Sequence, residues 1–455
     1  MASLCLGVGV FVARSTPRSP LPEGFAEKTA ERLEVVDGPG PETAPPEGAL
    51  NVVLVIACTL RKDQTPLHDP DLDTMPFLRS LADRGAQLED LITAAPWTKA
   101  ASTAILTSRH ALEVGMVEPG PRRNERVLPT EVLTLAERFR RAGYRTVGGT
   151  ANPNLHSTYG FQRGFQRYWE PRRDWHGTGG VKLPGRGIAE LVVTELDGGE
   201  ADRPYYLQVL FVDAHAPFPP AAPAADGVPQ LVADYRHGLA RLDEAIAYLA
   251  GQLDERGLLH NTLFVVVNDH GEGLLHPASH GKSHGRYLSP STVGGVGVFA
   301  GPGIPAGHRV EGVASQVDLS PTIWRLAGLP PQEDFGGQDL SAAVRGETPR
   351  TSRERAYTDT WFRKVNRGAF YEDGRACQLA EDQGLTDRNG VTFVPGCFDR
   401  HDDPDHLRPS PEPEALASLA AWRRSAIARG TSFVVGRSEA SEGLDQQLEA
   451  LGYVD

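Results

Sequence analysis

Three clusters of polar residues stand directly after apolar runs of the chain, and their side chains are of types that bind metal ions or attack esters. The clusters are Cys58-Thr59, Asp213–His215 and Asp269-His270. Carboxylate, imidazole and thiolate groups are common metal ligands, and hydroxyl groups are nucleophiles once a base or a metal activates them. An acidic residue next to a histidine after a buried strand therefore predicts half of a metal site at Asp269 and His270. The alternative is a polar turn that caps the following segment.

Alternating strands and helices are expected to position these clusters. The run NVVLVIA at 51–57 is continuous and β-branched, which is typical of a buried parallel strand. The other expected elements are helices within 73–85 and 231–257, a helix that stops at Gly143 and a strand within 131–150, and strands within 205–215 and 261–273. This order predicts an α/β fold with a central, mostly parallel sheet flanked by helices. In such folds, functional residues gather at the carboxyl ends of the strands.

The chain divides into four predicted parts. Residues 1–13 are apolar but too few to span a bilayer, and they are interpreted either as the remnant of an export signal or as a mis-started N-terminus. Residues 14–48 are rich in Pro and Gly and predict a linker, so order is expected to begin at Asn51. An α/β domain over 49–345 and a smaller α+β subdomain over 346–455 complete the chain.

Charge and cysteine content limit the partners and the compartment. The chain has 46 basic and 59 acidic residues and a net charge of −13, which argues against a nucleic-acid partner. A periplasmic or extracellular location is favoured over a cytoplasmic one, and membrane association is expected only if residues 1–13 are an anchor. Cys377 and Cys397 could pair in an exported protein. We favour two unrelated free thiols, because spacing alone cannot establish a bridge.

Several blocks of the sequence, in order, resemble the sulfatase branch of the alkaline phosphatase superfamily. They lie at 51–63, 95–110, 143–165, 211–220, 258–273, 283–307 and 317–330, and the tail QQLEALGYVD is also similar. The resemblance implies a central mixed sheet flanked by helices, with a smaller C-terminal sheet and helix. It also implies hydrolysis of sulfuric or phosphoric esters with the help of one divalent metal ion, calcium or zinc, if the protein is active.

The nucleophile block departs from the family pattern. Sulfatases carry Cys or Ser followed by x-Pro-x-Arg, and that Cys or Ser matures to formylglycine. Here Thr98 occupies the nucleophile position, Ala100 replaces the Pro and Ser102 replaces the Arg. Formylglycine is therefore not expected, and an active Thr98 would attack directly as an alkoxide. Its alternative role is to cap the helix that follows, and the two roles could coexist.

The first metal block is also altered. The resemblance places Asp269 and His270 at ligand positions, but Cys58 stands where the family has its leading Asp. Calcium prefers several oxygen ligands, so a thiol should weaken its binding. A thiolate with Asp269 and His270 could suit zinc instead. The plainer interpretation, which we favour from the sequence, is that Cys58 is a small buried apolar residue and that the metal is lost.

Several cationic residues match positions that contact the substrate in the family. His215 matches a substrate-contacting or proton-donating position, and His284 and Arg286, together with Lys282, could form an anion pocket or lie on a solvated loop. Two functions remain open. The first is a metal-assisted hydrolase of sulfuric or phosphoric esters. The second is a non-catalytic relative that binds a small anionic ligand or a partner. It is suggested by Cys58, which replaces a metal-binding Asp of the family, and by the absence of the family's nucleophile motif.

Overall fold

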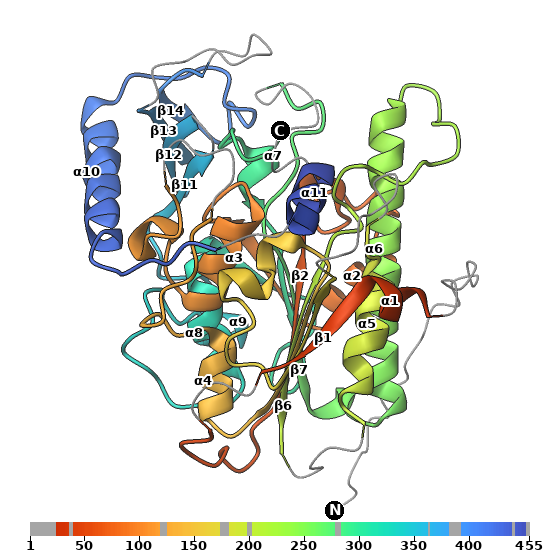
Figure 1. Cartoon of the computed structure of the whole chain (residues 1–455). Coiled ribbons are helices and arrows are strands. Elements are labelled where there is room, and N and C mark those ends of the chain that lie inside the picture. Colours follow the sequence, from red (N-terminus) through yellow and green to blue (C-terminus); the bar gives the residue numbers. More distant parts are fainter. Residues whose placement is uncertain are drawn as a thin grey trace, which may run out of the picture.

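The computed structural model describes residues 24–35, 40–118, 125–172, 182–197, 203–277, 284–362, 365–381, 393–438 and 442–451. Two sheets and a set of flanking helices make up this part of the chain (Figure 1). The helices are α1 (Phe25–Thr29), α2 (Pro76–Asp83), α3 (Thr98–Thr107), α4 (Leu135–Arg141), α5 (Gly185–Thr194), α6 (Gln230–Glu255), α7 (Pro290–Val293), α8 (Leu319–Leu326), α9 (Ser341–Val344), α10 (Pro413–Gly430) and α11 (Glu442–Ala450). Among these described helices, none is both long enough and apolar enough to cross a membrane.

The large sheet is mixed and mostly parallel at its centre, as the sequence predicts. Its order is β1-β5-β4-β6-β2-β7-β9-β3-β10, with β8 paired to β3. The strands are β1 (Ala30–Glu34), β2 (Asn51–Ala57), β3 (Ala86–Ile92), β4 (Arg145–Thr150), β5 (Arg167–Pro171), β6 (Tyr205–Phe211), β7 (Thr262–Asn268), β8 (Gly294–Gly295), β9 (Gly297–Ala300) and β10 (His308–Ser315). Strands β4, β6, β2 and β7 run parallel, and every residue of β2, β6 and β7 is buried. Burial on both faces explains their continuous apolar runs.

Helices cover both faces of this sheet. Helices α1, α2, α5 and α6 lie on one face, and α3, α4, α8 and α9 lie on the other (Figure 1). Short 3₁₀ helices complete several connections: η1 (Lys62–Gln64), η2 (Ala111–Val114), η3 (Pro153–Leu155), η4 (Ser157–Tyr159), η6 (Leu259–Asn261) and η7 (Gln316–Asp318). The long helix α6 also caps its neighbour, since the Asp243 carboxylate accepts hydrogen bonds from the backbone N–H groups of Phe77 and Leu78 in the first turn of α2. The predicted α/β architecture is thus confirmed.

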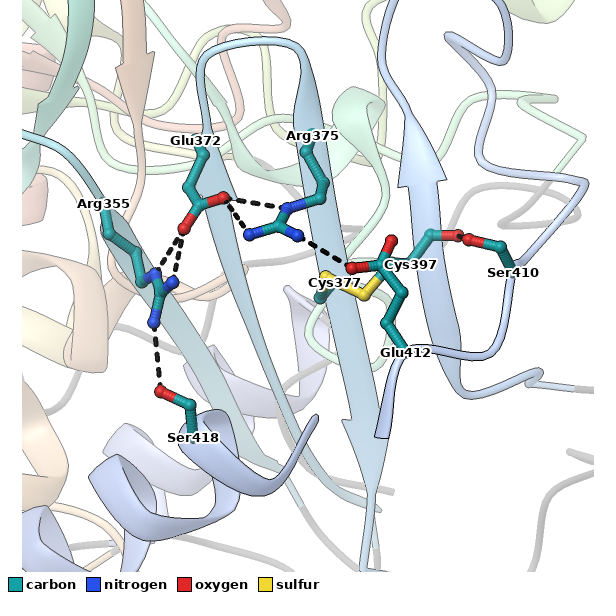
Figure 2. The surroundings of a disulfide bond; sticks show 8 residues. All are labelled: Arg355, Glu372, Arg375, Cys377, Cys397, Ser410, Glu412 and Ser418. Carbon is teal, nitrogen blue, oxygen red and sulfur yellow. Dashed lines mark hydrogen bonds and ion pairs between the residues drawn. A yellow bond between two sulfur atoms is a disulfide. The ribbon is translucent and has the colours of Figure 1, made fainter. Parts of the chain in front are cut away.

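A second, antiparallel sheet lies in the predicted C-terminal subdomain. Its strands are β11 (Ala356–Phe362), β12 (Val365–Glu372), β13 (Arg375–Ala380) and β14 (Gly396–Asp399), and helix α10 packs against it. Cys377 and Cys397 lie directly opposite each other on β13 and β14 and form a disulfide (Figure 2). The expectation of two free thiols is therefore wrong, because the pairing register that brings the two sulfur atoms together is not visible in their spacing.

Two further expectations need correction at the ends of the chain. Order does not begin at Asn51: within the predicted linker 14–48, residues Phe25–Glu34 form α1 and β1, and β1 pairs antiparallel with the edge strand β5. At the other end, helix α11 falls within the predicted C-terminal subdomain but packs on the main domain. Its Leu444 and Leu448 are buried in the main core. Residues 1–13 lie outside the described part of the chain.

Candidate active site

The central strands bring Cys58, Asp269 and His270 together at one edge of the main sheet. Strands β2 and β7 are parallel neighbours, and Ala57 is in register with Asn268. Cys58 and Asp269, the residues that follow, therefore leave the sheet side by side, and all three side chains are fully buried. The cluster thus lies at the carboxyl ends of parallel strands, which is where functional residues gather in α/β folds.

Thr98 lies at the centre of this group. Its Oγ1 is 3.3 Å from His270 Nε2 and 3.4 Å from Cys58 Sγ, and Asn152 Nδ2 donates to it over 3.3 Å. Thr98 is the first residue of α3 and Trp97 is its N-cap, with no side-chain capping bond. The alternative role of Thr98 as the cap is therefore wrong. At this position the partial positive charge of the helix N-terminus favours a negative charge on the threonine oxygen.

Asp269 and His270 are oriented by the backbone. Asp269 Oδ1 accepts hydrogen bonds from the N–H groups of Thr59 (3.1 Å) and His270 (2.6 Å), whereas Oδ2 is buried, has no hydrogen-bond partner among the described residues and lies 3.6 Å from His270 Nε2. His270 Nδ1 is 2.8 Å from the Gly271 carbonyl, so it donates there and leaves a lone pair on Nε2. Burial lowers the pKa of His270, which favours this neutral form.

The donor atoms of Cys58, Asp269 and His270 could hold a divalent metal ion. One sulfur, one carboxylate oxygen and one imidazole nitrogen lie within 4.8 Å of one another. Burial and the Asp269 carboxylate raise the pKa of the Cys58 thiol well above its usual range, so a bound cation would be needed to keep the thiolate. This donor set fits zinc, which accepts three mixed ligands and an open position, better than calcium, which needs about six to eight oxygens.

Three histidines line up next to this group. The His284 ring lies 4.6 Å from the His270 ring and 5.0 Å from the His215 ring, centroid to centroid. Burial alone would lower the pKa of His284, but the buried Glu272 carboxylate, whose Oε2 is 3.1 Å from His284 Nδ1, outweighs burial and raises it. Burial, together with His284, lowers the pKa of His215 well below its ordinary value. His284 is thus the imidazole of the three that most readily carries a proton.

The structure says less about the other two predicted substrate contacts, Lys282 and Arg286. Lys282 lies outside the described residues. Arg286 follows His284 by two positions, and its backbone carbonyl accepts a hydrogen bond from Arg367 Nη1 in the C-terminal sheet (3.1 Å). A substrate contact by either residue stays a prediction.

Sequence reasoning missed three residues of this site. Asn152 also donates to Cys58 Sγ (3.5 Å), and Glu272 holds His284. Lys182 Nζ donates to the carbonyls of Val212 and His215, and burial lowers the pKa of Lys182 to about 8. Asn152 follows β4, so the strand-end rule that found Cys58 and Asp269 also points to it. Nothing in the sequence near Lys182 indicates its position, because the contact joins segments that are 30 or more residues apart.

The chain that carries this geometry matches a known family. A family model described as Sulfatase matches residues 50–329 of the 455-residue chain. The chain belongs to the sulfatase family. The matched range contains Cys58, Thr98, Asp269 and His270, so the altered residues occupy the family's own domain.

Individual relatives match this chain only in part. Steryl-sulfatase of Rattus norvegicus is 33% identical over 171 residues, which cover 34% of this chain and 28% of that protein. The ulvan-active sulfatase of Formosa agariphila is 24% identical over 335 residues, 63% of each protein. The chain spans only 23% to 35% of the length of the animal steryl-sulfatases and arylsulfatases K that it matches.

Solved structures share the fold. The structure of BT4656 in complex with its substrate D-glucosamine-2-N,6-O-disulfate superposes with a TM-score of 0.68 at 14% identity and covers 84% of this chain and 98% of that chain. Phosphonate monoester hydrolase SpPMH from Silicibacter pomeroyi gives a TM-score of 0.60 at 17% identity, with 85% and 96% covered. At these identities the likeness concerns the fold alone, which confirms the sulfatase and alkaline phosphatase architecture.

Proposed function

We propose that this sulfatase-family protein hydrolyses small sulfuric or phosphoric esters with Thr98 as the nucleophile. The observation that carries the proposal is the position of Thr98 Oγ1 at the N-terminus of α3, within 3.3 to 3.4 Å of His270, Asn152 and Cys58. A hydroxyl group in this setting has both a fixed orientation and groups that favour its ionised form. Without an activating environment a threonine hydroxyl is a weak nucleophile.

The chain's own residues account for most steps of such a reaction. Thr98 Oγ1 releases its proton to solvent and forms a bond to the sulfur or phosphorus atom, while the bond to the leaving oxygen breaks. Asn152 Nδ2 holds the attacking oxygen in place. His284, whose pKa Glu272 raises, would give its proton to the leaving oxygen or bind the negative oxygens of the ester. Water then cleaves the threonine ester and releases sulfate or phosphate.

A divalent metal ion could take part in this reaction, because one sulfur, one oxygen and one nitrogen donor lie close enough together to bind it. Cys58, Asp269 and His270 would hold it. Once bound, such an ion would lower the pKa of the Thr98 hydroxyl and withdraw charge from the nonbridging ester oxygens. Zinc is favoured over calcium because only one of the three donors is a carboxylate.

The decisive experiment measures bound metal and ester hydrolysis on the same preparation. The purified protein would be analysed for zinc and calcium and assayed with aryl sulfates and aryl phosphates. Thr98→Ala should abolish turnover and leave the fold unchanged. The matched control is Thr107→Ala on the same helix, whose buried hydroxyl donates to the Thr103 carbonyl and which should leave turnover close to wild type. Equal turnover in wild type and Thr98→Ala would refute the proposed nucleophile.

The second candidate function is binding without catalysis. The raised pKa of the buried Cys58 thiol favours it, since a protonated thiol gives the site no metal and leaves Thr98 unactivated. It predicts neither metal nor turnover in the wild type, metal uptake by Cys58→Asp, and binding of sulfate or phosphate that is weakened by His284→Ala. Metal-dependent turnover in the wild type would exclude it.

We infer further that the protein works outside the cytoplasm, in the periplasm or beyond. The disulfide between Cys377 and Cys397 supports this location, because such bonds persist in oxidising compartments and are rare in the cytosol. Alkylation followed by mass spectrometry of protein isolated from its native cells should leave Cys377 and Cys397 unmodified until a reductant is added. Complete alkylation of both residues without reductant would contradict this location.

A further inference from the structure

One buried side chain, that of Gln316, ties together the two segments that form the ester site. Gln316 is the first residue of η7, directly after β10, and it is fully buried. Its amide oxygen Oε1 accepts a hydrogen bond from the backbone N–H of Ala94 over 2.8 Å. Its amide nitrogen Nε2 donates to the backbone carbonyls of Asn268 (2.8 Å) and Asp269 (2.7 Å). These three partners lie between 47 and 222 positions away from Gln316 in the sequence.

The two ends of this amide hold the two segments that carry the proposed chemistry. Ala94 lies in the connection between β3 and α3, which leads directly to Thr98. Asn268 ends β7, and Asp269 follows it as a candidate metal ligand. Strands β3 and β7 do not pair with each other, because β9 lies between them in the sheet. The Gln316 side chain therefore makes a direct link that the strand pairing does not supply.

The partners of the Gln316 amide fix its orientation. The oxygen faces an N–H group and the NH₂ group faces two carbonyl oxygens, so every hydrogen bond joins a donor to an acceptor. A flipped amide would set its NH₂ group against the Ala94 N–H and its oxygen against both carbonyls, which would break all three bonds. Since the side chain is buried, water cannot replace these bonds, and one arrangement is strongly favoured.

The backbone that carries Gln316 is itself firmly held. The Ser315 N–H donates to the Asp318 carboxylate over 2.9 Å. The same buried carboxylate forms an ion pair with Arg353 and accepts a hydrogen bond from the Gln338 N–H over 2.7 Å. Gln316 thus extends from a fixed turn to its three backbone partners.

We propose that Gln316 is a positioning residue that sets the place of Thr98 relative to Asp269 and His270. This inference rests on the proposed function, in which Thr98 Oγ1 attacks the ester from a point 3.3 Å from His270 Nε2. A reaction centre must hold its groups to within about 0.5 Å, and a misplacement of about 1 Å can lower the rate by about 10²-fold. Because Gln316 holds the backbone on both sides of this contact, its loss should change the distance without removing a group that touches the ester.

The test compares Gln316→Met with the matched control Gln208→Met. Methionine has nearly the length of glutamine but forms none of the three hydrogen bonds. Gln208 is also buried, and its Oε1 accepts a hydrogen bond from the Tyr206 hydroxyl within β6. Both variants should lower the thermal midpoint, because each leaves buried polar groups unpaired. Only Gln316→Met should lower kcat for an aryl ester, by about 10- to 10²-fold with KM near wild type.

Crystal structures of the wild type and both variants give a readout that does not depend on turnover. The distance from Thr98 Oγ1 to His270 Nε2 should lengthen by more than about 0.5 Å in Gln316→Met and stay at the wild-type value in Gln208→Met. If Gln316→Met does not fold, Gln316→Glu takes its place, since its carboxyl group keeps the acceptor for Ala94 but has at most one proton for the two carbonyls.

An unchanged Thr98–His270 distance in the folded Gln316 variant would overturn the inference, whatever the turnover. A longer distance with unchanged kcat would overturn it as well, because the placement would then not matter for the reaction. Absence of turnover in the wild type would refute the proposed function instead, and the comparison of distances would still decide whether Gln316 positions Thr98.

Discussion

Two neighbouring regions of this molecule use polar residues in opposite ways. At the carboxyl ends of β2 and β7, Cys58, Thr98, Asp269 and His270 are fully buried and contact one another without any Lys or Arg ion pair among the described residues. In the C-terminal sheet, partly exposed charged residues form ion pairs beside a disulfide. Figure 2 shows Arg355 and Arg375 on the Glu372 carboxylate, with Arg375 also reaching Glu412.

This difference suggests that the Thr98 cluster serves a reaction, whereas the polar contacts of the C-terminal sheet serve stability. Buried polar groups without neutralising partners interact strongly with whatever charge enters their site, which suits a reaction centre. Partly exposed ion pairs are screened by water and contribute little, so the disulfide between Cys377 and Cys397 should stabilise the small sheet more than these pairs do. Substitutions in one region should therefore change activity and those in the other should change stability.

The largest effect is expected at Asp269. Asp269→Asn keeps an oxygen that can accept the bonds from Thr59 and His270, but it removes the negative charge from the proposed metal site. If the protein hydrolyses esters, kcat/KM should fall by at least about 10²-fold, the usual effect of removing one preorganised electrostatic group. Kinetics with an aryl ester measure this, and a thermal midpoint near that of wild type shows that the fold is intact. Unchanged kcat/KM would place the chemistry elsewhere.

A pH-dependent effect is expected where the two regions meet. Asp359 of β11 donates its backbone N–H to the Ala94 carbonyl of the main domain, and burial raises the pKa of its side chain to about 7, with Arg423 opposing and Glu113 adding to the shift. Because the folded pKa lies above the unfolded value of 3.8, the contribution of Asp359 to stability is greatest below the unfolded pKa and is lost as pH rises to about 7. That loss amounts to about 4 kcal/mol at most.

Asp359→Asn tests this contribution, because the amide has nearly the same shape and does not titrate. Urea unfolding at several pH values should show that wild type loses stability relative to this variant as pH rises from about 4 to about 7. A difference between the two proteins that does not change with pH would show that Asp359 ionises freely in the folded protein.

The disulfide gives the next effect. Replacing Cys377 and Cys397 together by Ser opens a loop with a sequence separation of 20 and should lower the free energy of unfolding by about 3 kcal/mol. Because both residues are buried in the separate core of the small sheet, ester turnover should remain at the wild-type value under conditions where the protein stays folded. Urea unfolding and kinetics on the same preparation measure both. A parallel loss of turnover would mean that the small sheet supports the reaction centre.

The sequence predicted the parts of this comparison that depend on local pattern. The apolar runs now seen as β2, β6 and β7, each followed by polar residues, identify the central sheet and place Cys58 and Asp269 at one edge. The parts it missed depend on long-range register. Strand β1 is short and half exposed, so its pattern is weak, and only pairing with β5 makes it part of the sheet. The disulfide was missed for the same reason, because it depends on the register between β13 and β14.

The smallest effect is expected at Arg375. Its side chain is 39% exposed, and the Glu372 carboxylate that it contacts is also bound by Arg355, so Arg375→Ala leaves that carboxylate paired. The free energy of unfolding should fall by less than about 1 kcal/mol, and less again at high salt, because water and ions screen exposed pairs. Urea unfolding at low and high salt measures this. A loss comparable to that of the disulfide would show that these ion pairs behave as buried ones, and the contrast between the two regions would then rest on the Thr98 cluster alone.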